Sequence, residues 1–109
     1  MFIALEVALQ LVAAFRPIIE AVMPRDKDLA GQMRRAVTSA PLNTAEGNRR
    51  NGGDRIHAFR VAAGEAEEAV TAARVALALG YIDEPMLAPA AAIEHRLQGL
   101  LWGLRGRRR

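Results

Sequence analysis

The chain has 109 residues, of which 15 are basic and 12 acidic, and it contains no cysteine. A chain of this length forms one domain around one core, and an apolar fraction of 51% is enough to fill that core. The lack of cysteine excludes disulfides and thiolate chemistry and agrees with a reducing, cytoplasmic compartment. Alanine is abundant and aromatic residues make only 5%, which favours closely packed helices over sheets.

The basic residues are unevenly distributed along the chain. Four of the 15 lie in residues 105–109, which leaves 11 to set against the 12 acidic residues. The body of the chain is therefore near neutral, and its basicity belongs largely to a tail. We expect a folded domain over residues 1–104 and a basic C-terminal tail over residues 105–109.

The first predicted helix covers about residues 2–22 and is apolar over most of its surface. Pro17 is expected to kink or split it. No basic segment precedes the helix and no stretch reaches the roughly 20 apolar residues of a membrane span, so we expect no signal peptide and no membrane partner. So wide an apolar surface indicates cover on more than one side, and hence an oligomer. The polar interruptions are Glu6, Gln10, Arg16 and Glu20.

The second predicted helix has Asp26 or Asp28 as its N-cap. Pro41 lies inside its apolar pattern and is expected to kink it. Residues 47–53, Gly-Asn-Arg-Arg-Asn-Gly-Gly, indicate a turn, with Gly47 in the helix or in its last turn. The apolar residues that repeat at steps of three and four are Leu29, Met33, Ala36, Val37 and Ala40.

A third helix is expected after this turn, with Asp54 as its N-cap and Gly80 as its left-handed stop after Leu79. Gly64 in its interior indicates either close approach of another helix or a tolerated glycine. Its predicted apolar stripe consists of Ile56, Phe59, Ala63, Ala66, Val70, Ala73 and Leu77.

A fourth helix is expected from the cap Asp83 onwards, with Pro85 in its first turn. Its apolar residues form a seam of the coiled-coil kind. Four helices with short links predict an all-α, antiparallel up-down-up-down four-helix bundle. The seam consists of Met86, Ala90, Ile93, Leu97, Leu100 and Leu104.

No pattern in the sequence indicates catalysis, a metal or a cofactor. The two histidines, His57 and His95, lack the Glu-x-x-His spacing that di-iron bundles use. Glu65, Glu67 and Glu68 bring carboxylates together, but nothing supplies the desolvated cleft that acid–base catalysis needs. We interpret them as a solvated or inter-subunit acidic face and expect no enzyme activity.

Arginines gather around the turn between the second and third helices. Arginine is the favoured partner of phosphate because its planar fork donates two hydrogen bonds. Alternatively, Arg49 and Arg50 pair with Glu46, three and four residues earlier, and the tail only confers solubility. The candidate contacts to nucleic acid are Arg49, Arg50, Arg55, Arg105, Arg107, Arg108 and Arg109.

Residues 28–50 resemble the signature of the four-helix bundle proteins encoded in 23S rRNA intervening sequences. The accessory variability protein of diversity-generating retroelements belongs to the same group. The family pattern has Gln-x-x-Arg, then Ser-x-Pro-x-Asn-x-Ala-Glu-Gly and basic residues. It is matched by Gln32, Arg35, Ser39, Pro41, Asn43, Ala45, Glu46, Gly47, Arg49 and Arg50.

A second family element, Ala-x-Gly-Ser-x-x-Glu-Leu, is matched in part. Ala62, Gly64 and Glu68 fit, whereas Glu65 stands in place of serine and Ala69 in place of leucine. The Leu-Gly-Tyr-Ile step at residues 79–82 also fits, and the resemblance spans about residues 3–104.

The resemblance implies a bundle that assembles into a homopentameric ring. For the retroelement members it implies binding to a reverse transcriptase and to nucleic acid through a basic surface, whereas the rRNA-encoded members have no established activity. We therefore expect a non-enzymatic homo-oligomeric adaptor whose partners are its own copies and RNA, DNA or a reverse transcriptase. The alternative is a structural or protein-interaction ring with no role in nucleic-acid binding.

The motif residues also have a physical interpretation, which is structural rather than catalytic. Asn43 and Glu46 sit about one turn apart, just after Pro41. An amide and a carboxylate there can satisfy backbone groups that the proline frees, or can bind Arg35. No nucleophile or metal-ligand set accompanies them.

Overall fold

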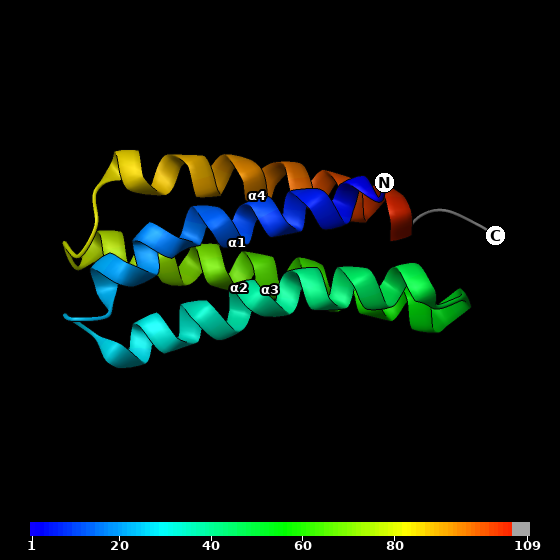
Figure 1. Cartoon of the computed structure of the whole chain (residues 1–109), viewed down its shortest axis with the longest axis horizontal. Coiled ribbons are helices and arrows are strands. Elements are labelled where there is room, and N and C mark those ends of the chain that lie inside the picture. Colours follow the sequence, from blue (N-terminus) through cyan, green and yellow to red (C-terminus); the bar gives the residue numbers. More distant parts are fainter. Residues whose placement is uncertain (106–109) are drawn as a thin grey trace.

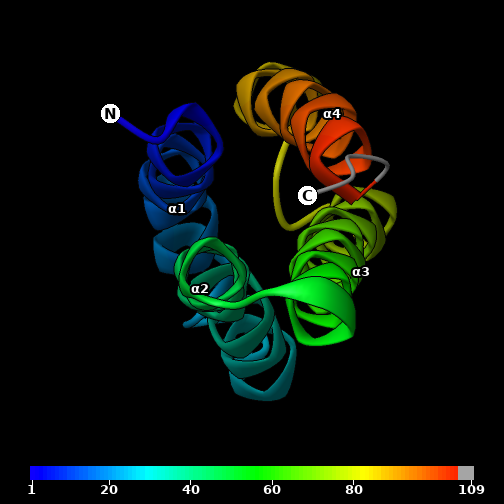
Figure 2. The ribbon, with the colours of Figure 1, turned by 90° about the vertical axis from the view of Figure 1, so that its right-hand side faces the viewer.

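The computed structural model describes residues 1–105 and forms a single bundle of helices. The chain reverses direction at each connection between helices (Figure 1), and a view along the bundle shows the helices in chain order around a ring (Figure 2). Each helix packs against the next one, and the first also packs against the last. The predicted all-α, four-helix fold is confirmed within these residues. The helices are α1 (Ile3–Val22), α2 (Lys27–Arg49), α3 (Gly52–Ala78) and α4 (Glu84–Arg105).

The core combines the many alanines of α3 with larger residues, most of which come from the other helices. Eight of the ten buried residues of α3 are alanines, so its backbone can approach its neighbours closely. Alanine costs no side-chain entropy in a helix and leaves room for bulky partners. The largest fully buried side chains are Phe15, Phe59, Leu11, Ile18, Met33, Leu97 and Leu101.

Three predicted helix ends are confirmed. The backbone N–H of Leu29 donates to Asp26 Oδ1 at 3.0 Å, so Asp26 caps α2. Asp83 caps α4 in the same way, because its Oδ1 accepts from the backbone N–H of Met86 at 3.0 Å. Gly80, with φ of +80°, ends α3.

The prediction that Asp54 caps the third helix is wrong. Helix α2 continues to Arg49, and α3 already begins at Gly52 with Asn51 in the N-cap position. Gly52 has φ of +58°, which a glycine adopts without a steric penalty, so the chain enters the new helix at once. Asp54 instead lies in the first turn of α3, where its charge favours the positive end of the helix.

Helices α1 and α2 continue through their internal prolines, so the split considered at Pro17 does not occur. Pro17 removes the hydrogen bond to the carbonyl of Ala13, but both residues are exposed and water can solvate that carbonyl. Pro41 is buried inside α2. The bends expected at the two prolines stay predictions.

The predicted apolar stripes lie largely at the core. In α3, Ile56 and Leu77 are half-buried and the other predicted members are buried. The seam of α4 is offset from its prediction: Ala90 and Leu97 are buried, but the remaining members are half-buried. Leu87 and Leu101 are buried beside them. The half-buried members are Met86, Ile93, Leu100 and Leu104.

The replacement Gly47→Ala should destabilise the bundle. The added Cβ would lie 2.5 Å from Cε1 of Phe59, whose ring is fully buried and cannot move without disturbing the core. Overpacking of this kind costs about 1–3 kcal/mol, which urea unfolding would measure as a lower free energy of unfolding.

The matched control is Gly64→Ala in the interior of α3. Nothing lies within 4 Å of a Cβ added there, so no helix of the described chain approaches it closely and the tolerated-glycine interpretation holds. Alanine should raise the free energy of unfolding by roughly 0.5–1 kcal/mol. Equal stability of the two variants would contradict the packing of Gly47 against Phe59.

Candidate functional site

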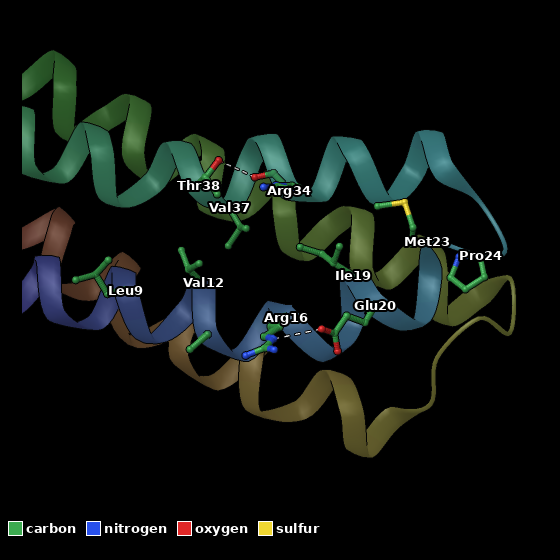
Figure 3. A pocket seen from close by; sticks show the side chains of 11 residues that line it. Leu9, Val12, Arg16, Ile19, Glu20, Met23, Pro24, Arg34, Val37 and Thr38 are labelled. Carbon is green, nitrogen blue, oxygen red and sulfur yellow. Dashed lines mark hydrogen bonds and ion pairs between the residues drawn. The ribbon is translucent and has the colours of Figure 1, made fainter.

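An open apolar groove runs along the outside of α1 and α2 (Figure 3). Val12 of α1 and Val37 of α2 point toward each other across it, and Leu9 is 48% exposed. Exposed apolar side chains that lie together along two helices make the groove a candidate interaction site. It agrees with the apolar width noted for the first helix. The apolar lining consists of Leu9, Val12, Ala13, Ile19, Met23, Pro24 and Val37.

Polar side chains complete the lining of the groove. Arg16 Nε donates to Glu20 Oε2 at 3.2 Å along α1, in an exposed pair of the kind worth at most about 1 kcal/mol. Thr38 Oγ1 donates to the backbone carbonyl of Arg34 at 2.7 Å (Figure 3). The guanidinium of Arg34 makes no salt bridge within residues 1–105. It is therefore available to a carboxylate from outside.

The corner between α2 and α3 holds an arginine cluster built around Glu46. Arg49 Nη2 donates to Glu46 Oε1, and Arg50 Nε donates to Glu46 Oε2. The hydrogen bonds from Arg50 and then from Arg49 lower the pKa of Glu46, and the bond to Glu46 raises the pKa of Arg50. The alternative that these two arginines pair with Glu46 is confirmed.

Arg55 is held in the same corner by a different set of contacts. Its Nη1 donates to the backbone carbonyl of Gly47 at 3.2 Å, and its guanidinium lies 4.8 Å from the centroid of the Phe59 ring. The three corner arginines face two carboxylates, Glu46 and Asp54, so a small positive excess remains.

The charges differ between the two ends of the bundle. Figure 1 places the α2–α3 corner, the N-terminus and the end of α4 together at one end. Arg105 joins the corner arginines there, while Arg107, Arg108 and Arg109 lie outside the described residues. Because α4 includes Arg105, the first residue of the predicted tail belongs to the helix. At the opposite end, Asp26, Asp28, Asp83 and Glu84 outnumber Arg25 and Lys27.

The motif residues of α2 form a stripe along one face of the helix. Gln32, Arg35, Ser39, Asn43 and Glu46 step by three or four residues. The first two are exposed, and the other three are half-buried. Asn43 Nδ2 donates to Ser39 O at 3.0 Å and to Ser39 Oγ at 2.9 Å.

These contacts correct the roles predicted for Asn43 and Glu46. Asn43 does bind a backbone carbonyl, but it is that of Ser39 and not the Val37 carbonyl that Pro41 leaves without its usual donor. Glu46 binds Arg49 and Arg50, three and four residues on, instead of Arg35 or a backbone group. Arg35 is 11 residues from Glu46 and therefore about three turns away along the helix, whereas Arg49 and Arg50 are charged donors within one turn.

The remaining motif positions fall into two groups. Pro41 and Gly47 are buried in the bundle, whereas Gly64 and Glu68 lie exposed on α3. Glu65 is half-buried and Glu67 is exposed, so the carboxylates of α3 are near solvent. Within the described part of the chain, no group of three or more His, Cys, Asp or Glu residues could hold a metal ion.

Sequence reasoning missed one exposed aromatic residue, Trp102 of α4. It is 69% exposed, and the guanidinium of Arg105 lies 5.0 Å from its ring centroid. The spacing of a tryptophan and an arginine three residues apart in a last helical turn could have indicated this pair.

No helix within residues 1–105 is long and apolar enough to cross a membrane.

The Glu46 carboxyl should titrate below its ordinary value of 4.5, because the two arginines favour its charged form. Because the pKa of Glu46 is lower in the folded state than in the unfolded state, the pairing stabilises the fold at pH values above the unfolded-state pKa. This stabilisation is lost as the pH falls through the folded-state pKa. An NMR titration of the Glu46 carboxyl measures this midpoint. In the double variant Arg49→Ala/Arg50→Ala it should return toward 4.5, and an unchanged midpoint would contradict the pairing.

Comparisons with known proteins agree with the fold. A crystal structure of a protein of unknown function from the S23 ribosomal protein family of Bacteroides thetaiotaomicron superposes with a TM-score of 0.85 at 17% identity. The match covers 95% of this chain and 99% of that one. No curated protein matches the chain. The 23S rRNA-intervening sequence protein family matches residues 3–102, and the chain therefore belongs to that family.

Proposed function

We propose that the protein is a non-enzymatic adaptor that works as a homo-oligomer, with a second copy of the chain seated in the α1–α2 groove. The observation that carries this proposal is the groove itself, which leaves apolar side chains such as Leu9 and Met23 in contact with water. Burying such surface against a partner is favourable by about 25 cal/mol per Å².

A strip on α3 of the next copy has the chemistry to fill the groove. Val75 and Leu79 are 44% and 54% exposed, and Glu68 lies on the same face of the helix. The Glu68 carboxylate forms no salt bridge within the structure described, so it can pair with Arg34 beside the groove. Contact between two different surfaces of successive copies is heterologous and can close into a ring.

The family resemblance extends this proposal to a pentameric ring in the cytoplasm. Each subunit would be an antiparallel up-down-up-down bundle with α2 bent at Pro41. The exposed motif residue Glu68 would then act at the subunit contact. The contacts within a single chain give Glu68 no such role.

Nucleic-acid contact is the second part of the proposal, and the charge difference between the bundle ends supports it. A ring that carries its subunits side by side would gather Arg49, Arg50, Arg55 and Arg105 of every copy on one face, and the summed field would attract phosphates. RNA, DNA or a reverse transcriptase would be the partner. The alternative is a ring with no nucleic-acid role, in which the arginines serve only their contacts within the protein.

The replacement Leu9→Glu should dissociate the oligomer, because it places a charge among the exposed apolar side chains that line the proposed contact. Sedimentation velocity at micromolar concentration should show an assembly for the native chain and a folded monomer for the variant. The matched control Gln10→Glu adds the same charge one residue along α1, at an exposed position that does not line the groove. A native chain that sediments as a stable monomer would contradict the proposal.

Replacing Arg49, Arg50 and Arg55 together by alanine should weaken binding to RNA or DNA. Binding is measured over a salt series, and the slope of the logarithm of the binding constant against the logarithm of the salt concentration should become shallower by up to about 2. Each phosphate contact with a single strand contributes about 0.7 to this slope, and three arginines are removed. A control that removes Arg25, Lys27 and Arg74 takes away the same charge elsewhere and should change the slope less. Absent binding at low salt would favour the ring with no nucleic-acid role.

A further inference from the structure

The exposed Trp102 has no role in the fold or in the proposed subunit contact. It is the only tryptophan of the chain, and 69% of it is accessible to solvent near the end of α4. Tryptophan is highly buried on average in folded proteins. An aromatic ring left open at a basic end therefore indicates a ligand that offers a flat partner and negative charge.

The contact with Arg105 places a positive charge against the Trp102 ring, where such a ligand would bind. The guanidinium lies 5.0 Å from the ring centroid, in the range of a cation–π interaction. It can cover only one face of the indole, and with 69% of Trp102 exposed much of the remainder meets solvent. A nucleobase can stack on an open indole face, and such stacking tolerates any base because every base has a π-face.

A second arginine lies at the level of Trp102 on the neighbouring helix. Gln98 Nε2 donates to the backbone carbonyl of Ala63 at 2.8 Å and thereby fixes α4 against α3. The two helices run in opposite directions in Figure 1. Trp102, one turn after Gln98, and Arg60, about one turn before Ala63, therefore lie at the same height. Arg60 is exposed and makes no salt bridge with any residue that the structure describes.

We propose that this surface binds single-stranded nucleic acid, with a base stacked on Trp102 and phosphates contacted by Arg105 and Arg60. The inference rests on the proposed nucleic-acid function and adds to it the strand type and the stacking residue. A single strand is favoured over a duplex because the base faces of a duplex are already stacked on one another, whereas an unpaired base can turn toward the ring.

Intrinsic fluorescence tests the proposal directly, since Trp102 is the sole tryptophan. The full chain is titrated at low salt with an oligothymidylate of about 12 nucleotides, within the usual range of site sizes, and with a duplex of equal length. Stacking should quench the emission on addition of the single strand and leave it nearly unchanged with the duplex.

Variants then separate stacking from charge, with binding measured by anisotropy of the labelled oligothymidylate. Trp102→Ala should weaken binding by about 5- to 150-fold, the range expected for the loss of one stacked base, whereas Trp102→Phe should retain much of it. Leu42→Ala is the control, because it removes another exposed large apolar side chain, on α2, and should change nothing.

Three results would overturn the inference. The first is that the native chain binds without quenching, that Trp102→Ala still binds, and that removal of the corner arginines weakens binding. This result would refute stacking and leave the proposed function intact. Dissociation of the oligomer by Trp102→Ala, with unchanged affinity per subunit, would make Trp102 a subunit contact instead. No binding to either nucleic acid at low salt would refute this inference and the nucleic-acid part of the proposed function, and would leave the ring with no nucleic-acid role.

Discussion

The close approach of α2 and α3 is the constraint on which the rest of the bundle depends. Alanines make up most of the buried residues of α3, and Gly47 gives the Phe59 ring the space that a Cβ would occupy. Small residues at a helix contact bring the two backbones together but leave little side-chain volume to fill a core. Apart from the Phe59 ring, most of the large core side chains come from other helices, among them Leu11, Phe15 and Ile18 of α1.

The apolar character of α1, which supplies large core residues, explains why one part of the bundle surface is apolar. Helix α1 directs its largest residues inward, yet Leu9, Ala13 and Met23 on its other side have no helix of the same chain to cover them. A four-helix ring gives each helix only two neighbours, so a helix that is apolar over more than that arc leaves a strip in water. The open groove is thus a consequence of the pattern in α1, and the second copy that we propose would cover it.

Much of the fold could be predicted because it depends on local signals. The caps Asp26 and Asp83 and the stop at Gly80 each act through one side chain or one dihedral angle. The entry into α3 was mispredicted because Asp54 is as good a cap as Asn51 by residue type, and the early start depends on the positive φ of Gly52, which residue type alone does not report. The exposure of Trp102 and the sharing of Glu46 by two arginines depend on tertiary placement and rotamers, which periodicity does not report.

In the proposed nucleic-acid contact, the arginine corner would serve both stability and binding. Glu46 holds Arg49 and Arg50 in place and neutralises one of their two charges, so a phosphate that approaches meets ordered donors but must compete with a carboxylate. The competing carboxylate lowers the affinity of the corner for phosphate. The same pairing already orders the two arginine side chains, so they lose less conformational freedom when phosphate binds. Arg105 and Arg60 have no carboxylate partner among the described residues. Phosphates should therefore prefer the side of the basic end that carries Trp102, with the corner arginines extending that surface toward α2.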